Sequence, residues 1–418
     1  MSLEPKPSLG EAVKYWHRLG WVSFGGPVAQ VAMMHEDLVV ERGWITEEQY
    51  RRALTLCTLL PGPEAQQLAT YLGWVLNGVV GGLCAGSLFI LPSIAILLSL
   101  AFLFVHFGQL HFVDAFLFGL KPAVFAFIAF ATFKLAKKNL LQDRQLWIAI
   151  AAFFMALLHF SFVIIFLGSL AAGLYWSRQE GDIQSLSGNL RNRFTINDLR
   201  YSAIVIVVVL MSWLLPIALL NLFSFQAQWF RQLTLFFTGA AVFSFGGAYT
   251  VLPYVWSGVT LNHWMTNSEM MSALALGETT PGPLIMIVAF VGFVATWNQV
   301  HTVDIDHGWF ALIGGMIAVW YTFLPSFLGV FLGAPLVERL GALPDFKKIF
   351  SALFSAVVGM MSLLVLRTLG SMLHAGHWQV NALQLLLGTL TFVVLWKKPQ
   401  VPAWLLVVLC GLVGMIIG

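Results

Sequence analysis

The chain has 418 residues, of which 59% are hydrophobic and only 10% are charged, with a formal net charge of +3. A typical soluble domain carries about 25% charged residues, so a soluble protein of this length could not bury so much apolar surface. Apolar runs of about 20 residues recur along the chain, and that is the length a helix needs to cross a bilayer. The composition predicts an all-α polytopic membrane protein. It excludes a soluble enzyme, and the scattered basic residues give no sign of nucleic-acid binding.

We predict about thirteen transmembrane helices from the apolar segments. In chain order they lie near residues 17–34, 52–74, 76–105, 112–136, 145–158, 160–176, 202–222, 231–255, 269–296, 309–334, 347–372, 380–396 and 401–417. The third segment contains Pro92, which predicts that this helix is bent or split.

The distribution of lysine and arginine predicts the orientation, because cytoplasmic loops are enriched in both. Basic residues collect after the even-numbered segments, as at Lys137, Lys138 and Arg144. We therefore expect a cytoplasmic N-terminus and a periplasmic C-terminus. The exception is the loop 35–51, which mixes acidic residues with basic ones although this model places it outside.

Two motifs occur twice, in the same order and at almost the same spacing. Phe24-Gly25-Gly26 precedes Pro61-Gly62-Pro63, and about 220 residues later Phe245-Gly246-Gly247 precedes Pro281-Gly282-Pro283. Between them, Trp44-Ile45-Thr46 matches Trp264-Met265-Thr266. A repeat of this length predicts two homologous halves.

The repeat divides the thirteen segments into six, one and six. An odd number of crossings before the second copy predicts two inverted-topology repeats, related by a pseudo-two-fold axis in the membrane plane. Leu91-Pro92-Ser93 also matches Leu324-Pro325-Ser326, at a larger displacement that predicts an insertion near 298–308. The expected units are an N-terminal cytoplasmic segment 1–16, a first repeat 17–176, a cytoplasmic linker 177–200, a connecting helix 201–222 and a second repeat 223–418.

The repeated motifs predict discontinuous helices, because proline removes a backbone donor and glycine loosens the turn. Backbone groups freed inside a bilayer must face protein, water or a ligand, and a helix that starts at the break directs free amides and a positive dipole end toward it. A packing kink explains a single copy, whereas two matched copies favour an oxyanion site. The predicted substrate-binding residues are Ser23, Phe24, Gly25, Gly26, Pro61, Gly62, Pro63, Lys121, Ser244, Phe245, Gly246, Gly247, Pro281, Gly282 and Pro283.

Ionisable residues at membrane depth are functional candidates. Glu64 follows the first Pro-Gly-Pro motif directly, and Glu278 precedes the second by three residues. They are not equivalent in the repeat, which suggests specific roles such as proton coupling, with an ion pair or a capping role as the alternative. Lys121, before Pro122, is the deepest cation and the first choice to face a dianion.

These residues resemble the chromate transporter family. The segment Leu59–Tyr71, which contains Pro-Gly-Pro-Glu-Ala-Gln-Gln, resembles its most distinctive block, and Ser23–Pro27 through Glu41–Ile45 resembles its N-terminal motif. Thr280–Pro283 resembles the counterpart in the second half. The resemblance covers nearly the whole chain and indicates the long, two-domain form.

The resemblance implies a secondary transporter in the bacterial inner membrane that exports chromate, driven by a proton or electrical gradient. The chain has no Walker-type phosphate loop, which agrees with secondary transport. The alternatives are a sulfate or other oxyanion carrier on the same fold, a passive channel, or a membrane-embedded enzyme, which the absence of any haem, flavin, metal or catalytic motif disfavours. The expected partners are chromate, sulfate as its analogue, the lipid bilayer and a second copy in a homodimer; no cofactor, metal or nucleic acid is expected.

Overall fold

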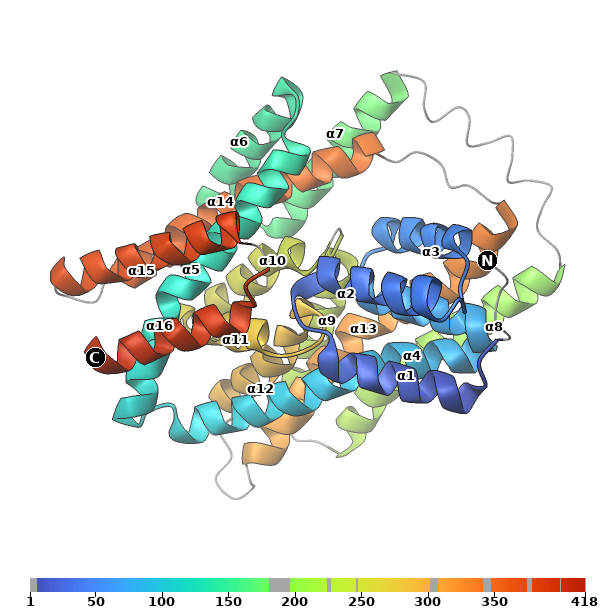
Figure 1. The fold of residues 1–418 in the computed structure, drawn as a ribbon, viewed down its shortest axis with the longest axis horizontal. Coiled ribbons are helices and arrows are strands. Elements are labelled where there is room, and N and C mark those ends of the chain that lie inside the picture. Colours follow the sequence, from blue (N-terminus) through green and yellow to red (C-terminus); the bar gives the residue numbers. More distant parts are fainter. Residues whose placement is uncertain are drawn as a thin grey trace.

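The computed structural model describes residues 6–179, 196–223, 227–245, 247–300, 307–340, 347–373, 378–398 and 400–417. These ranges form helices and connecting turns, and none of them contains a strand (Figure 1). Most of the predicted linker 177–200 lies outside the described residues, and so does Gly246. The helices confirm an all-α protein.

Six of the described helices are long and apolar enough to cross a membrane, which agrees with a polytopic membrane protein. They cover Glu64–Phe107, His111–Asn139, Arg200–Leu222, Gly308–Pro335, Ile349–Leu373 and Trp378–Lys397. Other apolar segments form shorter helices, so the prediction of thirteen spans is not confirmed.

The first two predicted spans of the chain are each broken at a repeated motif. Helix α1 (Leu9–Val22) is followed by α2 (Gly26–His35), which continues into the short π-helix η1 (Glu36–Glu41). Helix α3 (Glu47–Leu59) is followed by α4 (Glu64–Phe107). The first Phe-Gly-Gly motif therefore ends at the first residue of α2, and the first Pro-Gly-Pro motif lies between α3 and α4.

The chain reverses direction between α1 and α2. The guanidinium of Arg42 lies 5.2 Å from the centre of the Tyr15 ring, and the ring of Trp44 lies 6.0 Å from that of Tyr15. A straight helix would separate Tyr15 from Trp44 by about 40 Å at 1.5 Å per residue. The two helices thus form a hairpin whose tip is at residues 23–25.

A second reversal occurs inside α4. Asn77 and Gly78 have non-helical backbone angles, whereas the helix continues through Pro92, where the sequence predicted a bend or split. A Cβ built on Gly86 would lie 2.2 Å from the Thr70 hydroxyl oxygen, so the parts of α4 on either side of the reversal run antiparallel in close contact. The first part forms a second hairpin with α3, and its tip is the Pro-Gly-Pro motif.

Both hairpins of the first repeat open toward one end of the molecule, which we call the near end and which holds residues 6–8, 36–46 and 77–78. The side-chain amide of Asn77 donates to the Pro7 carbonyl at 3.0 Å. The second part of α4 runs from there to the far end, where the ring of His106 lies 5.0 Å from that of Trp297.

The second repeat has the same arrangement of broken helices. Its elements are α9 (Ala227–Val242), α10 (Ala248–Leu261), α11 (Asn267–Thr279), the single-turn 3₁₀-helix η3 (Leu284–Met286) and α12 (Ile287–Gln299). The predicted spans 231–255 and 269–296 are therefore also broken at their motifs.

The hairpins of the second repeat open toward the far end. The Tyr254 hydroxyl donates to the Phe236 carbonyl at 3.0 Å, which places α10 antiparallel to α9. The Trp229 indole donates to the Thr296 hydroxyl at 3.1 Å, which joins the first turn of α9 to the last turn of α12. Thr296 is followed directly by Trp297, whose ring contacts His106 near the end of α4. The outer ends of these hairpins therefore lie at the far end.

The remaining helices complete the two halves. They are α5 (His111–Asn139), α6 (Asp143–Leu157), α7 (Phe162–Gln179), α8 (Ile196–Phe223), α13 (His307–Leu340), α14 (Lys347–Leu373), α15 (Trp378–Lys397) and α16 (Ala403–Ile417). Helix α14 packs against α6 and α7 of the first repeat, and α5 packs against α15 and α16 of the second. Figure 1 shows these six helices on one side of the hairpins.

The two repeats are thus interlocked rather than laid side by side. At the contact of α5 with α16, a Cβ built on Gly414 would lie 2.5 Å from the Gly119 Cα, so the two backbones touch. Small residues allow such close approach of helices in membranes. The interlocking fixes the hairpins of one repeat relative to those of the other.

The reversal at residues 23–25 predicts a topology that the simple span model does not. With the native cysteines replaced, we expect Gly10→Cys and Glu41→Cys to react with a membrane-impermeant maleimide from the same side, and Asn262→Cys from the opposite side. Labelling of intact cells and of inverted vesicles measures this. Reaction of the first two variants from opposite sides would contradict the hairpin.

Candidate functional site

The four repeated motifs meet as two reciprocal pairs. The amide of Gly62 donates to the Ser244 carbonyl at 2.5 Å, and the amide of Gly282 donates to the Ser23 carbonyl at 2.9 Å. Each Pro-Gly-Pro tip is thus bonded to the Phe-Gly-Gly tip of the other repeat. The sequence predicted that these segments come together, and the hydrogen bonds place them in contact.

Glycine is required at the centre of each Pro-Gly-Pro tip. Gly62 has φ +128° and Gly282 has φ +96°, a region that side chains rarely enter. A Cβ on Gly62 would lie 2.2 Å from the Ser326 hydroxyl oxygen, and one on Gly282 would lie 2.0 Å from that of Ser93. Both conformation and space therefore exclude a side chain.

Two polar residues hold the tips by hydrogen bonds, and a third faces one of them. The Ser93 hydroxyl donates to the Pro281 carbonyl, and the Gln67 side-chain amide donates to the Pro61 carbonyl at 2.7 Å. Ser326 is the repeat counterpart of Ser93 and faces Gly62. In the sequence analysis both serines served only as markers of the repeat. Their equivalent positions in the two repeats were the signal that could have assigned them to the site.

Four helical segments begin at the tips without a side-chain cap. They start after Gly25, Pro63, Gly247 and Pro283. By contrast, three helices that begin at the outer ends of the hairpins, α1, α3 and α11, carry capping boxes, at Ser8, Thr46 and Thr266. Because the first amides of a helix have no acceptor within it, the uncapped starts present donors and positive dipole ends. This arrangement suits an anion.

Buried polar atoms without a partner surround the tips. In the described chain they include the hydroxyls of Ser244 and Ser326 and the side-chain oxygens of Gln30, Gln66 and Gln67. All five residues are fully buried. Such atoms cost free energy unless a ligand or water satisfies them, so they mark the tips as a binding region.

The two candidate carboxylates have different surroundings. The Tyr249 hydroxyl donates to the Glu278 carboxylate, which ties the start of α10 to the end of α11. Glu64 is the first residue of α4 and is only partly buried. Tyr249 was missed by sequence reasoning, because its equivalent in the first repeat is Val28.

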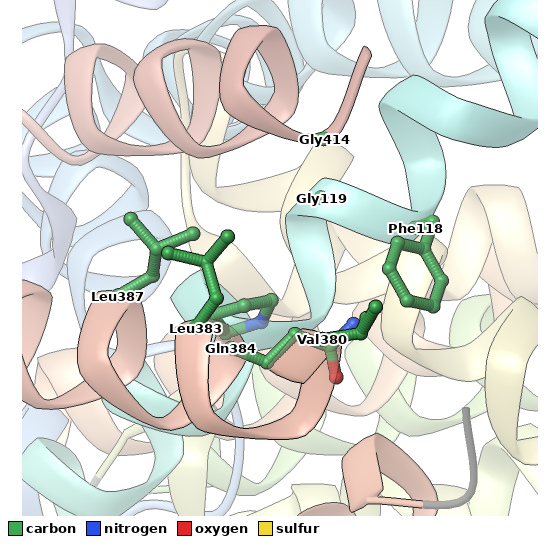
Figure 2. Close-up of a pocket in the computed structure, with 8 residues that line it drawn as sticks. Phe118, Gly119, Val380, Leu383, Gln384, Leu387 and Gly414 are labelled. Carbon is green, nitrogen blue, oxygen red and sulfur yellow. The ribbon is translucent and has the colours of Figure 1, made fainter. Parts of the chain in front are cut away.

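The described contact of Lys121 lies within its own helix, α5. Its ammonium lies 5.0 Å from the centre of the Phe118 ring on the same helix. Phe118 in turn lines a small apolar pocket together with Gln384 and Gly414, between α5, α15 and α16 (Figure 2). Lys121 itself is not among the residues that line this pocket.

The described residues contain no group of three or more His, Cys, Asp or Glu side chains arranged to hold a metal ion. Cys57 and Cys410 are buried, Cys84 is partly buried, and all three are free. The chemistry that the tips offer is hydrogen-bond donation from backbone and hydroxyl groups.

The comparison with known families matches the two halves separately. The model described as "Chromate transporter" matches residues 10–174 and again residues 231–415. This chain belongs to the chromate transporter family. The double match confirms the two homologous repeats and the long, two-domain form that the sequence predicted. Membership of a transporter family supports a transporter rather than an enzyme.

Relatives across bacteria and archaea support the assignment. The chain is 31% identical to a chromate transport protein of Cupriavidus metallidurans, over 85% of this chain and 81% of the relative. It is 28% identical to a probable chromate transport protein of Synechococcus elongatus, over 100% of this chain and 97% of the relative. An uncharacterized transporter of Methanocaldococcus jannaschii is 28% identical over 95% of this chain and 91% of its own length. No solved structure matches the fold.

The tips make a quantitative prediction about stability. Gly282→Ala should destabilise the protein by about 1–3 kcal/mol from backbone strain alone, with more from the contact with Ser93. Thermal unfolding in detergent measures this. Gly168→Ala, at an α7 position with nothing within 4 Å, is the matched control and should be close to neutral. Equal stability of the two variants would contradict the tight tip.

Proposed function

We propose that this protein is a secondary active transporter that exports chromate from the cytoplasm across the bacterial inner membrane. The observation that carries the proposal is the junction of two Pro-Gly-Pro tips with two Phe-Gly-Gly tips, at which four uncapped helical starts meet. A tetrahedral dianion accepts hydrogen bonds on every face, which such a set of donors can supply.

We further propose that the halves are inverted repeats across the bilayer. The hairpins of the first repeat open at the near end and those of the second at the far end, which supports this. Each hairpin then enters the membrane part of the way, since a helix of 14 residues such as α1 is about 21 Å long. The expected unit boundaries, 17–176 and 223–418, stay as part of this proposal.

The proposed orientation removes an exception in the charge pattern. The loop 35–51 mixes acidic residues with Arg42 and Arg51, which a periplasmic position did not explain. In the structure this loop lies at the near end with Pro7. A cytoplasmic near end therefore brings the loop into agreement with the positive-inside rule, and the C-terminus stays periplasmic in the proposal.

The two pairs of hairpins are packed differently, as expected of a carrier held in one of two access states. Helix α11 packs against α5 and α16, and α10 packs against α14. In the first repeat α2 and α3 pack mainly against α4 and α13, and Val28 of α2 is 77% exposed. We propose that α2 and α3 border the open access route.

The proposed substrate contacts are the motif residues at the tips, with the hydroxyls of Ser23 and Ser244 among them. Lys121 stays a candidate counter-charge, because α5 packs against α11, whose last turn leads into the second Pro-Gly-Pro tip.

Sulfate is the alternative substrate on the same fold. Sulfate and chromate share charge and tetrahedral shape, so hydrogen bonds at the tips discriminate weakly between them. The names of the relatives from Cupriavidus metallidurans and Synechococcus elongatus favour chromate. A homodimer in the membrane is a further proposal.

The function is tested in sealed liposomes. The purified protein should take up radiolabelled chromate, an imposed pH gradient should stimulate the uptake, and excess sulfate should inhibit it only in part. Liposomes without protein and liposomes made leaky with detergent are the controls. Robust sulfate uptake without chromate uptake would reassign the substrate, and flux that no gradient alters would indicate a channel.

The carboxylates at the tips are proposed to couple transport to protons. Glu278→Gln keeps an acceptor for the Tyr249 hydroxyl but removes the titratable group, so stimulation by a pH gradient should be lost while chromate binding is kept. Glu64→Gln tests the other candidate in the same assay. Tyr249→Phe is the control for the hydrogen bond alone. Unchanged gradient stimulation in both glutamine variants would exclude the two carboxylates from coupling.

A further inference from the structure

The two Pro-Gly-Pro tips are equivalent by sequence but differ in one hydrogen bond. At the second tip, the Ser93 hydroxyl donates to the carbonyl of Pro281. The equivalent bond at the first tip would join Ser326 to the carbonyl of Pro61. That bond is absent, and the Ser326 hydroxyl has no partner although the residue is fully buried.

Gln67 explains the difference. Its side-chain amide occupies the Pro61 carbonyl at 2.7 Å, the place that Ser326 would take by symmetry. The residue equivalent to Gln67 in the second repeat is Ile287, which offers no hydrogen bond, so Ser93 is left to serve Pro281 there. One polar residue in place of an apolar one has therefore released a buried hydroxyl.

The released hydroxyl points at the start of a helix. A Cβ built on Gly62 would lie 2.2 Å from the Ser326 oxygen and 2.5 Å from the Gln67 side-chain nitrogen. Gly62 directly precedes Pro63, after which α4 begins without a side-chain cap. The hydroxyl of Ser244, also fully buried and without a partner, belongs to the residue whose carbonyl accepts from Gly62.

We propose that the Ser326 hydroxyl is a hydrogen-bond donor to the transported oxyanion, and that Gln67 is a positioning residue that keeps this hydroxyl free. The proposal rests on the proposed function. It makes the site asymmetric, because the anion binds on the Gly62 side of the junction, where hydroxyl donors are unused. On the Gly282 side the equivalent hydroxyl is engaged in holding the tip.

Two serine variants separate binding from structure. Ser326→Ala should raise the KM for chromate by about 10-fold to 100-fold, the usual effect of losing a hydrogen bond to a charged group. Its thermal stability without substrate should be unchanged or higher, since an unpaired buried hydroxyl is removed. Ser362→Ala, whose hydroxyl donates to the Val358 carbonyl within α14, is the control and should leave both the thermal stability and the KM near those of the wild type.

A third variant tests the role of Gln67. In Gln67→Ile, which copies the second repeat, the Pro61 carbonyl becomes available and should capture the Ser326 hydroxyl. The KM should then rise as in Ser326→Ala although the hydroxyl is still present. Adding Ser326→Ala to this variant should raise the KM no further, whereas independent roles would give additive effects.

The thermal shift produced by chromate or sulfate in detergent tests Ser326 independently of transport. The wild type should be stabilised by the oxyanion, and Ser326→Ala should lose most of this shift. If the wild type binds the oxyanion but does not transport it, the proposed transport function is contradicted. The thermal shift would still measure whether Ser326 donates to the bound anion. A Ser326→Ala variant with wild-type KM and wild-type shift would overturn the inference, as would an equal KM effect in Ser362→Ala.

Discussion

The structure depends on the pair of reciprocal hydrogen bonds from the amides of Gly62 and Gly282 to the carbonyls of Ser244 and Ser23. Each bond joins a hairpin of one repeat to a hairpin of the other, so neither tip is held by its own repeat alone. Backbone groups at helix breaks must be satisfied where water is scarce, and here they satisfy one another. The same contacts bring the helical starts close enough together to act on one ligand.

The hairpins also explain how non-helical backbone can stand inside an apolar protein. The tips are enclosed by α4 and α13, which pass close to Gly62 and Gly282 and supply the serines that face them. The interlocking of α5 and α14 with the last two helices of the opposite repeat fixes this frame. A rigid frame around tips with unused donors is a physical basis for binding an anion without a resident cofactor or metal.

Sequence reasoning succeeded where a pattern recurs and failed where direction matters. The double motif predicted the two homologous halves and the interruption of four helices. Hydropathy marked the segments 17–34 and 52–74 as membrane spans but left open whether they re-enter, because hydropathy measures how apolar a segment is and not whether the chain turns back. Gly25, Gly62 and Asn77 mark the reversals, but glycine and proline are compatible with a kink as well as with a turn. The prediction that Lys121 faces the substrate stays a prediction, since depth along a helix does not fix which neighbour a side chain meets.

By itself the sequence determined the class of protein, the internal repeat, the family and the residues of the motifs, because composition and spacing are properties of the chain alone. The tertiary structure decided that the motifs are the tips of hairpins, that each tip bonds to the opposite repeat, and that Ser326 is free where Ser93 is engaged. These properties depend on contacts between residues about 180 to 260 positions apart. Such contacts form only after the chain has reversed and the repeats have interlocked, so no local pattern could encode them.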